Sequence, residues 1–209
     1  MSIFFTADEH HGHENIIRFC KRPFSGIEEM TEKLVANHNE VVKPGDHVFH
    51  LGDMFWRTFG LDPALKLMAR LNGRHFYIYG NHCELFRHKE LRDCFEWCKD
   101  VDNLKVQGYP NIWLSHYAHR VWNGSHRGAY HVYGHTHNVL PEGDYLSTDV
   151  GVDAQNFYPI SLEDVDKKLK ARKGRFDGAQ WVCECGNKFL ATNTSPTVCA
   201  KCTKEMRLV

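Results

Sequence analysis

The stretch that decides the fold reads Ile-Phe-Phe-Thr-Ala-Asp-Glu-His-His-Gly at residues 3–12. It opens with a short apolar run, which is typical of a buried strand, and Asp8 and His10 follow this run at once. In open α/β sheets, the binding sites lie just beyond the carboxyl ends of the strands. An acid and a histidine in this position therefore predict the rim of a functional site.

The same pattern recurs after four more apolar runs. Strands are expected over 3–7, 47–51, 75–79, 112–115 and 129–133. The residues that follow the last four are Gly52-Asp53, Gly80-Asn81-His82, His116 and Gly134-His135-Thr136-His137. Because these strands alternate with helical patterns, the predicted fold class is α/β.

Four helical segments and two further strands are expected between and after these runs. Ser25 and Glu28 have capping-box spacing at the start of one helix, and Ser161 and Asp164 have it at the start of another. Asp62-Pro63 is expected to cap a helix over 64–71. The remaining expectations are a helical segment over 84–99 and strands over 104–107 and 145–150.

The donors at the five strand ends form a mixed nitrogen and oxygen set without thiolate. They are Asp8, His10, Asp53, Asn81, His116, His135 and His137. Such a set suits manganese, iron, nickel or zinc better than calcium or an all-oxygen magnesium site. Seven donors exceed the needs of one ion, but they fit two divalent ions about 4 Å apart that share one carboxylate. Each pair alone is commonplace in proteins, and the ordered set is what indicates a dinuclear centre.

In this order the motifs are D-x-H at 8–10, G-D at 52–53, G-N-H at 80–82, a lone His116 and G-H-x-H at 134–137. With them, residues 2–166 resemble the calcineurin-like metallophosphoesterase superfamily. The stretches 8–17, 116–123 and 151–161 further resemble its small bacterial and phage-encoded members. The resemblance implies a four-layer α/β/β/α metallophosphoesterase sandwich over a domain of residues 1–174.

The resemblance also implies a role for each motif residue. One ion would be held by Asp8, His10, Asp53 and His137, and the other by Asp53, Asn81, His116 and His135. The bridging Asp53 and His82 would be the catalytic residues, with His82 placed to protonate the leaving group of a phosphate ester attacked by a metal-activated hydroxide. His119 and Arg120 are candidates for substrate binding. Cys83 follows the G-N-H motif where many members carry an acid, so the partner of His82 is open.

The C-terminal segment carries two close cysteine pairs. Cys183-x-Cys185 and Cys199-x-x-Cys202 are separated by thirteen residues, a spacing that can present four thiolates to one structural zinc. The pairs resemble a zinc ribbon, so residues 175–209 are expected to form a small zinc-ribbon domain. So short a segment cannot hold a core alone, which makes a structural metal physically reasonable.

The zero net charge of the 209 residues hides an asymmetry. Residues 167–209 hold ten basic and three acidic side chains, whereas residues 1–166 carry a net charge of −7. The basic segment suits a nucleic-acid partner, although a solvated helix end explains it equally well. With no secretory signal and no apolar run of 18 residues, a cytoplasmic protein without membrane contact is expected, and its eight cysteines are expected to be thiols or metal ligands.

The leading hypothesis is a metal-dependent phosphoesterase that acts on nucleotides or nucleic-acid ends, with phosphodiesters favoured. One alternative is a phosphomonoesterase acting on nucleic-acid ends or on a phosphoprotein. The second alternative is a nucleic-acid-binding adaptor with a vestigial phosphoesterase core. The sequence leaves the native substrate, the physiological metals and the oligomeric state open.

Overall fold

The computed structural model describes residues 1–143, 145–173, 180–182, 188–190 and 207–208. The chain divides into two compact units, Met1–Leu169 and Lys170–Val209. The first unit is an α/β structure built on two sheets, as the alternating pattern predicts. Within the described ranges, no helix is both long and apolar enough to cross a membrane.

The first sheet has the strand order β4-β3-β2-β1-β9. Strands β1 (Ile3–Thr6), β2 (His47–His50), β3 (Arg74–Ile78) and β4 (Cys98–Lys99) run parallel, and β9 (Ile160–Ser161) pairs antiparallel with β1. The parallel strands therefore end at the same edge, where the residues after β1, β2 and β3 meet.

The second sheet has the order β5-β6-β7-β8. Strands β6 (Ile112–Ser115), β7 (Tyr130–Tyr133) and β8 (Ser147–Asp149) run parallel, whereas β5 (Val101–Leu104) is antiparallel to β6. A β-bridge between Ala7 and Gly151 joins the ends of the two sheets.

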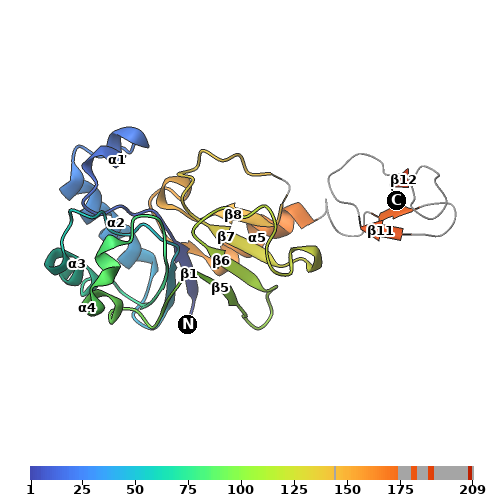
Figure 1. The fold of residues 1–209 in the computed structure, drawn as a ribbon, viewed down its shortest axis with the longest axis horizontal. Helices are drawn as coiled ribbons and strands as arrows, with labels where there is room; N and C mark the ends of the chain where they lie inside the picture. The colour runs from blue at the N-terminus through green and yellow to red at the C-terminus, as the bar shows by residue number, and fades with distance from the viewer. Residues whose placement is uncertain (144, 174–179, 183–187, 191–206, 209) are drawn as a thin grey trace. The chain divides into compact units, whose positions relative to one another are not determined.

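The main core lies between the sheets, because alternate side chains of each strand point to the same face. Phe5, Phe49 and Ile78 of the first sheet belong to one buried cluster with Leu114 and Val132 of the second. Burying a large apolar side chain contributes about 1.5–3 kcal/mol, so this shared cluster fixes the two sheets against each other. Figure 1 shows the strands β5–β8 on one side of β1 and the helices α2, α3 and α4 on the other.

The described part of the chain has five α-helices. They are α1 (Glu14–Phe19), α2 (Ile27–Val41), α3 (Leu61–Met68), α4 (Lys89–Arg92) and α5 (Leu162–Lys173), with 3₁₀ turns η1 (Glu84–Arg87), η2 (Ser125–Arg127) and η3 (Val152–Ala154). Helices α3 and α4 pack on Tyr77, and α5 buries Leu162, Val165 and Leu169 in the main core.

Two predicted helix starts are wrong in detail. Helix α2 is capped by Gly26, and Ser25 bonds Glu29 rather than Glu28. Helix α3 begins at Leu61, so Asp62 lies inside its first turn. Pro63 remains in that turn, where a backbone N–H needs no partner within the helix. The box at α5 is confirmed, because the N–H of Asp164 donates to Ser161 Oγ at 3.1 Å.

The predicted helical segment over 84–99 is confirmed only in its first half. The segment forms η1 and α4 and then pairs with β3, with the N–H of Tyr77 donating to Trp97 O at 3.0 Å and the N–H of Glu96 to His75 O at 2.8 Å. Without this pairing, the backbone groups along that edge of β3 would lack partners. The strand expected over 104–107 lies earlier, at β5.

The second unit contains a three-stranded antiparallel sheet of β10 (Gln180–Val182), β11 (Lys188–Leu190) and β12 (Arg207–Leu208), with β10 in the centre. The four predicted zinc ligands, Cys183, Cys185, Cys199 and Cys202, lie outside the described residues. So do residues 174–179, which contain the predicted domain boundary. The zinc ribbon and the boundary therefore stay predictions.

Candidate metal centre

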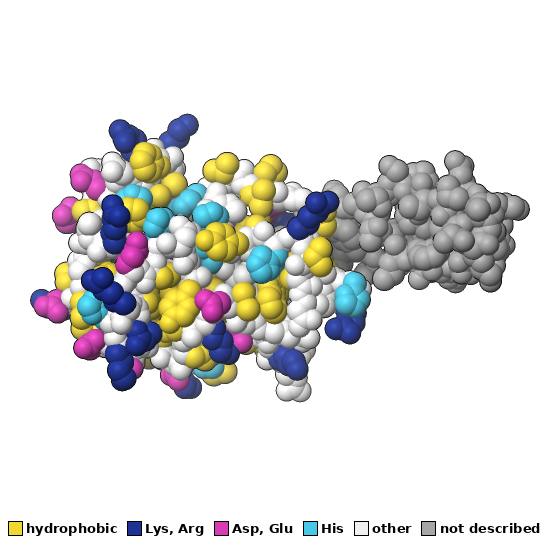
Figure 2. Space-filling model, viewed as in Figure 1, with side chains coloured by type: hydrophobic (Ala, Val, Ile, Leu, Met, Phe, Trp, Pro, Cys, Tyr) yellow, Lys and Arg dark blue, Asp and Glu magenta, His cyan; other side chains and the backbone are white. Residues whose placement is uncertain are grey.

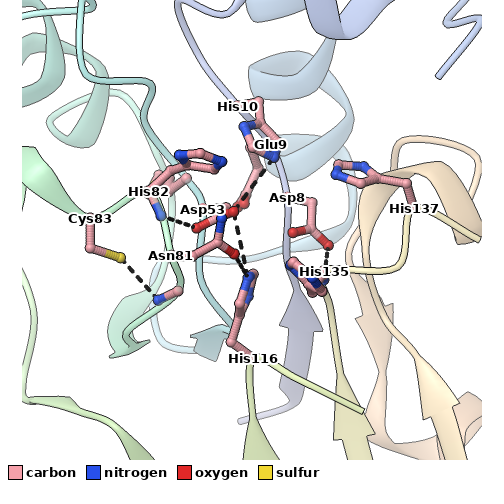
Figure 3. Close-up of polar contacts among 12 residues, drawn as sticks. Asp8, Glu9, His10, Asp53, Asn81, His82, Cys83, His116, His135 and His137 are labelled. Carbon is pink, nitrogen blue, oxygen red and sulfur yellow. Dashed lines mark hydrogen bonds and ion pairs between the residues drawn. The ribbon is translucent and has the colours of Figure 1, made fainter. Parts of the chain in front are cut away.

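Seven predicted ligands from five strand ends come together at the edge of the two sheets (Figure 3). The imidazole and carboxylate donors form two triads whose donor atoms lie within 4.8 Å of one another: Asp8, His10 and His137, and Asp53, His116 and His135. The seventh residue, Asn81, joins the second triad, because its Oδ1 lies 3.0 Å from Nε2 of His116.

Asp53 belongs to the second triad and also faces the first. Its Oδ2 atom is 3.8 Å from Nε2 of His10 and 3.5 Å from Nε2 of His116. Its Oδ1 atom accepts a hydrogen bond from the backbone N–H of His82 at 2.8 Å. One carboxylate therefore faces donors of both triads and is held in place by the loop after β3.

The orientation of His116 is set by the backbone. Its Nδ1 lies 2.7 Å from the carbonyl oxygen of Leu51, which can only accept, so Nδ1 carries the proton. Nε2 faces Asp53 and Asn81. Burial opposes protonation, but the neighbouring carboxylates raise the pKa of His116, so a metal ion bound there would take the place of a proton on Nε2. A histidine whose second nitrogen donates to a carbonyl is the usual form of a metal ligand.

The backbone of the site is strained. Asp8, His10, Asp53, His135 and His137 all have positive φ angles, between 45° and 67°. Residues other than glycine rarely adopt this conformation, and it costs roughly 1 kcal/mol or more at each position. Five candidate ligands share this conformation, which indicates that the fold holds their side chains in set directions at a cost in folding free energy.

The glycine before Asn81 has a specific steric reason. A Cβ atom on Gly80 would lie 2.2 Å from Oδ1 of Asp53 and 2.9 Å from its backbone nitrogen. At Gly52, where φ is +98°, a Cβ would lie 2.3 Å from Nδ1 of His116. These motif glycines therefore make room for the neighbouring ligand side chains.

The buried polar atoms of the first triad fit a cation. Oδ1 of Asp8 and both ring nitrogens of His10 are buried and have no hydrogen-bond partner among the described residues. An unpaired buried polar group is costly, and a divalent ion would satisfy a carboxylate oxygen and an imidazole lone pair together. The donor set thus fits the metal chemistry expected from the sequence.

Burial and neighbouring charges shift the titration of these donors. Burial lowers the pKa of His10 to about 2, so its imidazole is neutral, the form that binds metals. Burial raises the pKa of Asp8 to about 7. Burial also opposes ionisation of Asp53, but the hydrogen bond and charge of His116 outweigh it and lower the pKa to about 2. At neutral pH, Asp53 is therefore an anion beside neutral His10.

His82 lies over the centre with an aromatic neighbour. Its ring centroid is 4.5 Å from that of Trp56 and 5.7 Å from that of His10. Among the described residues it has no carboxylate partner. Cys83 does not take that role, because its Sγ accepts the N–H of Gly80 at 2.9 Å and thus stabilises the loop.

The two predicted substrate-binding residues, His119 and Arg120, belong to neither triad. His119 packs on the second sheet, where its Nδ1 accepts a hydrogen bond from Trp113 Nε1 at 3.0 Å and its ring stacks on His131. Arg120 is exposed. Their role in substrate binding stays a prediction.

Sequence reasoning missed two residues that contact the site. Asp153 accepts a hydrogen bond from Nδ1 of His137 at 2.7 Å, and Arg22 binds Asp153 through two nitrogens. A buried arginine paired with a carboxylate has no local sequence pattern. Asp153 lies in the stretch 151–161 that carries the resemblance, whereas no signal in the sequence points to Arg22.

The fold and the site together define an α/β protein with a candidate histidine–carboxylate metal centre. The chain is 30% identical over 177 residues to the uncharacterized protein MJ1445 of Methanocaldococcus jannaschii, a match that covers 82% of this chain and 93% of the relative. It therefore belongs to the same family as MJ1445. No model of a known protein family matches the chain.

Solved structures include similar chains. The protein of unknown function AQ665 from Aquifex aeolicus aligns with a TM-score of 0.64 and 25% identity, over 80% of this chain and 98% of that one. The Pseudomonas putida nuclease MPE aligns with a TM-score of 0.40 and 19% identity, over 65% of this chain and 61% of that one. A score of 0.40 is too low to establish a shared fold, whereas the match to AQ665 supports the α/β architecture.

Proposed function

We propose that the chain is a metal-dependent phosphoesterase with a dinuclear centre. The observation that carries the proposal is the position of Asp53, whose Oδ2 faces Nε2 of both His10 and His116 at 3.8 and 3.5 Å. Two cations that share a bridging ligand require one carboxylate that faces the donors of both metal positions. The resemblance of the motifs to calcineurin-like metallophosphoesterases supports the same assignment and its four-layer sandwich.

The proposed ligand sets follow the two triads. Asp8, His10, Asp53 and His137 would hold one ion, and Asp53, Asn81, His116 and His135 the other, with manganese, iron, nickel or zinc as candidates. When bound, such a pair supplies an acidified water and neutralises the charge of a phosphate ester. The chain's part is to hold these donors at fixed positions beyond the strand ends.

His82 is the proposed proton donor to the leaving group. Its backbone N–H bonds Asp53, which ties the position of the imidazole to the metal centre. Trp56 packs against the ring and limits its movement. A histidine needs no carboxylate partner to donate a proton near neutral pH, so Cys83 after the motif is compatible with this role.

A nucleotide or a nucleic-acid end, with phosphodiesters favoured, is the proposed substrate. Tyr117 is 47% exposed, and its ring lies 4.7 Å from that of His135 and 5.0 Å from that of His116. An exposed aromatic ring beside a phosphate site suits a substrate that carries a base. On the face drawn in Figure 2, several histidine side chains lie close together, with hydrophobic side chains beside them.

The appendage is proposed to be a zinc ribbon with one structural zinc on its four cysteines. The ten basic residues of 167–209 support nucleic acid as its partner. The alternative of a nucleic-acid-binding adaptor would use the same basic residues but predicts that no phosphate ester is hydrolysed. A phosphomonoesterase would share the metal centre and differ only in the ester that it prefers.

Hydrolysis of bis-p-nitrophenyl phosphate and of the p-nitrophenyl monoester, with Mn²⁺ or with a chelator, tests the proposal. We expect metal-dependent turnover, faster for the diester. Asp53→Asn should abolish it, because the bridging charge is lost. Faster monoester turnover would favour the phosphomonoesterase, and no turnover of either ester by the metal-loaded protein would contradict the enzyme and favour the adaptor.

A further inference from the structure

A buried arginine connects three segments around the centre. The side chain of Arg22, which follows α1, is fully buried. Its Nη2 donates to the carbonyl oxygen of Asp8 at 2.7 Å, and its Nη1 donates to that of Glu9 at 3.0 Å. These two carbonyls belong to the strained turn in which Asp8 and His10 have positive φ angles.

The same guanidinium clamps a carboxylate. Nε of Arg22 donates to Oδ1 of Asp153 at 2.8 Å, and Nη2 donates to Oδ2 at 2.7 Å. This is the bidentate geometry in which arginine–carboxylate pairs are strongest and most directional. Asp153 lies in η3, directly after the bridge between Ala7 and Gly151.

Asp153 in turn fixes one of the candidate ligands. Its Oδ2 lies 2.7 Å from Nδ1 of His137, so Nδ1 carries a proton and Nε2 is the nitrogen left to bind a metal ion. The His137 ring stacks on that of His10 with 5.2 Å between centroids. One ion pair therefore orients His137 and holds the turn of Asp8 and His10 at the same time.

We infer that Arg22 and Asp153 are positioning residues for the metal position formed by Asp8, His10 and His137. The inference rests on the proposed metal centre and adds that the affinity for one of its two ions depends on this buried pair, which does not itself bind the ion. Residues that hydrogen-bond to metal-binding histidines commonly change metal affinity by about 10- to 100-fold.

A different role for Asp153 is that of a ligand. Donor atoms of Cys20, His137 and Asp153 also lie within 4.8 Å of one another. However, both oxygens of Asp153 already accept hydrogen bonds from Arg22, and a cation beside them would meet the guanidinium charge. The geometry thus favours Asp153 as the partner of His137 rather than as a donor to a separate ion.

Calorimetric titration of the metal-stripped full chain with Mn²⁺ tests the inference. Asp153→Asn keeps the size of the side chain but presents an amide in place of one carboxylate oxygen. We expect one of the two ions to bind about 10- to 100-fold more weakly and the other to bind as in the wild type. Cys20→Ser should leave both affinities unchanged.

Tyr130→Phe is the matched control for stability. It removes another buried hydrogen bond to an aspartate, from the Tyr130 hydroxyl to Oδ1 of Asp166 at 2.8 Å. This variant should lower the melting temperature without changing either Mn²⁺ affinity. An Asp153→Asn variant that is equally destabilised but binds both ions normally would overturn the inference and leave the metal centre intact.

Two further outcomes are informative. Equal loss of one ion in Asp153→Asn and Cys20→Ser would overturn the positioning role in favour of a ligand role. Wild-type protein that binds no Mn²⁺ would overturn both the centre and the inference. If Asp153→Asn does not fold, nitrogen NMR of the Zn²⁺-loaded wild type decides, because the inference requires a slowly exchanging proton on Nδ1 of His137.

Discussion

Oδ2 of Asp53 lies 3.5 Å from Nε2 of His116, and the other nitrogen of that imidazole is bonded to the carbonyl oxygen of Leu51. The backbone of β2's end therefore selects the nitrogen that His116 presents to Asp53. Because Asp53 also follows β2, a few residues of one strand end position both a carboxylate and the histidine beside it. The centre is thus built into the sheet edge rather than into a long inserted loop.

His82→Ala should separate metal binding from turnover. The ring of His82 contacts Trp56 and not the triad oxygens, while its backbone N–H, which the substitution keeps, bonds Asp53. We expect Mn²⁺ affinity close to that of the wild type and a loss of about 10²- to 10⁴-fold in kcat, the usual contribution of a general acid. Loss of metal in calorimetry would show that His82 is a ligand instead.

Gly80→Ala should disturb the centre without changing any ligand. The new Cβ would lie 2.2 Å from Oδ1 of Asp53, so the carboxylate or the loop must move. We expect at least about a 10-fold loss of Mn²⁺ affinity, as for other changes that misorient a ligand. Gly45→Ala is the matched control, because a Cβ there meets no atom within 4 Å. Normal Mn²⁺ binding by Gly80→Ala would contradict the steric role of this glycine.

The metal-free protein should lose stability in mild acid through His131. Burial, with the charge of His119, lowers the pKa of His131 to about 3, below the value of about 6.5 expected in the unfolded chain. The stability that comes from keeping His131 neutral is thus complete above pH 6.5 or so. It falls by roughly 1.4 kcal/mol per pH unit as the pH drops toward 3.

The measurement is the melting temperature between pH 7 and 4.5 in the presence of a chelator. His131→Phe should make this pH dependence less steep, since other buried histidines with lowered pKa values remain, whereas substitution of His126, an exposed residue of η2, to Gln should not change it. An unchanged slope in His131→Phe would show that acid sensitivity arises elsewhere.

The proposed zinc ribbon predicts a third ion that does not depend on Asp53. Elemental analysis should find one zinc per chain that survives mild chelation, and Cys199→Ser should remove it and unfold the appendage. Asp53→Asn should retain this zinc while losing the other two ions. A wild-type chain without tightly bound zinc would contradict the ribbon.

The sequence predicts the edge of the site well because each ligand follows a strand directly. Four of the expected strands needed only small shifts, and Ile112–Ser115 has the predicted bounds. Short apolar runs that end in glycine or a polar ligand carry their own start and stop signals. This explains why seven residues far apart in the sequence could be assigned to one place.

The remaining features depend on contacts that no local pattern encodes. Arg22 and Asp153 are 131 residues apart, and their pairing follows only from the folded sheets. Leu91 and Phe95 have the four-residue spacing of a helix, but these side chains are buried with Tyr77 in a segment that also pairs with the edge of β3. In this segment, hydrogen bonding to β3 outweighs the local preference of the sequence for a helix.

The most direct test of the account is anomalous diffraction from crystals of the full chain loaded with Mn²⁺. The proposed dinuclear centre predicts two manganese peaks about 4 Å apart, with Asp53 Oδ2 between them, one peak beside His10 and the other beside His116. A single peak, or manganese bound away from Asp53, would contradict the dinuclear centre.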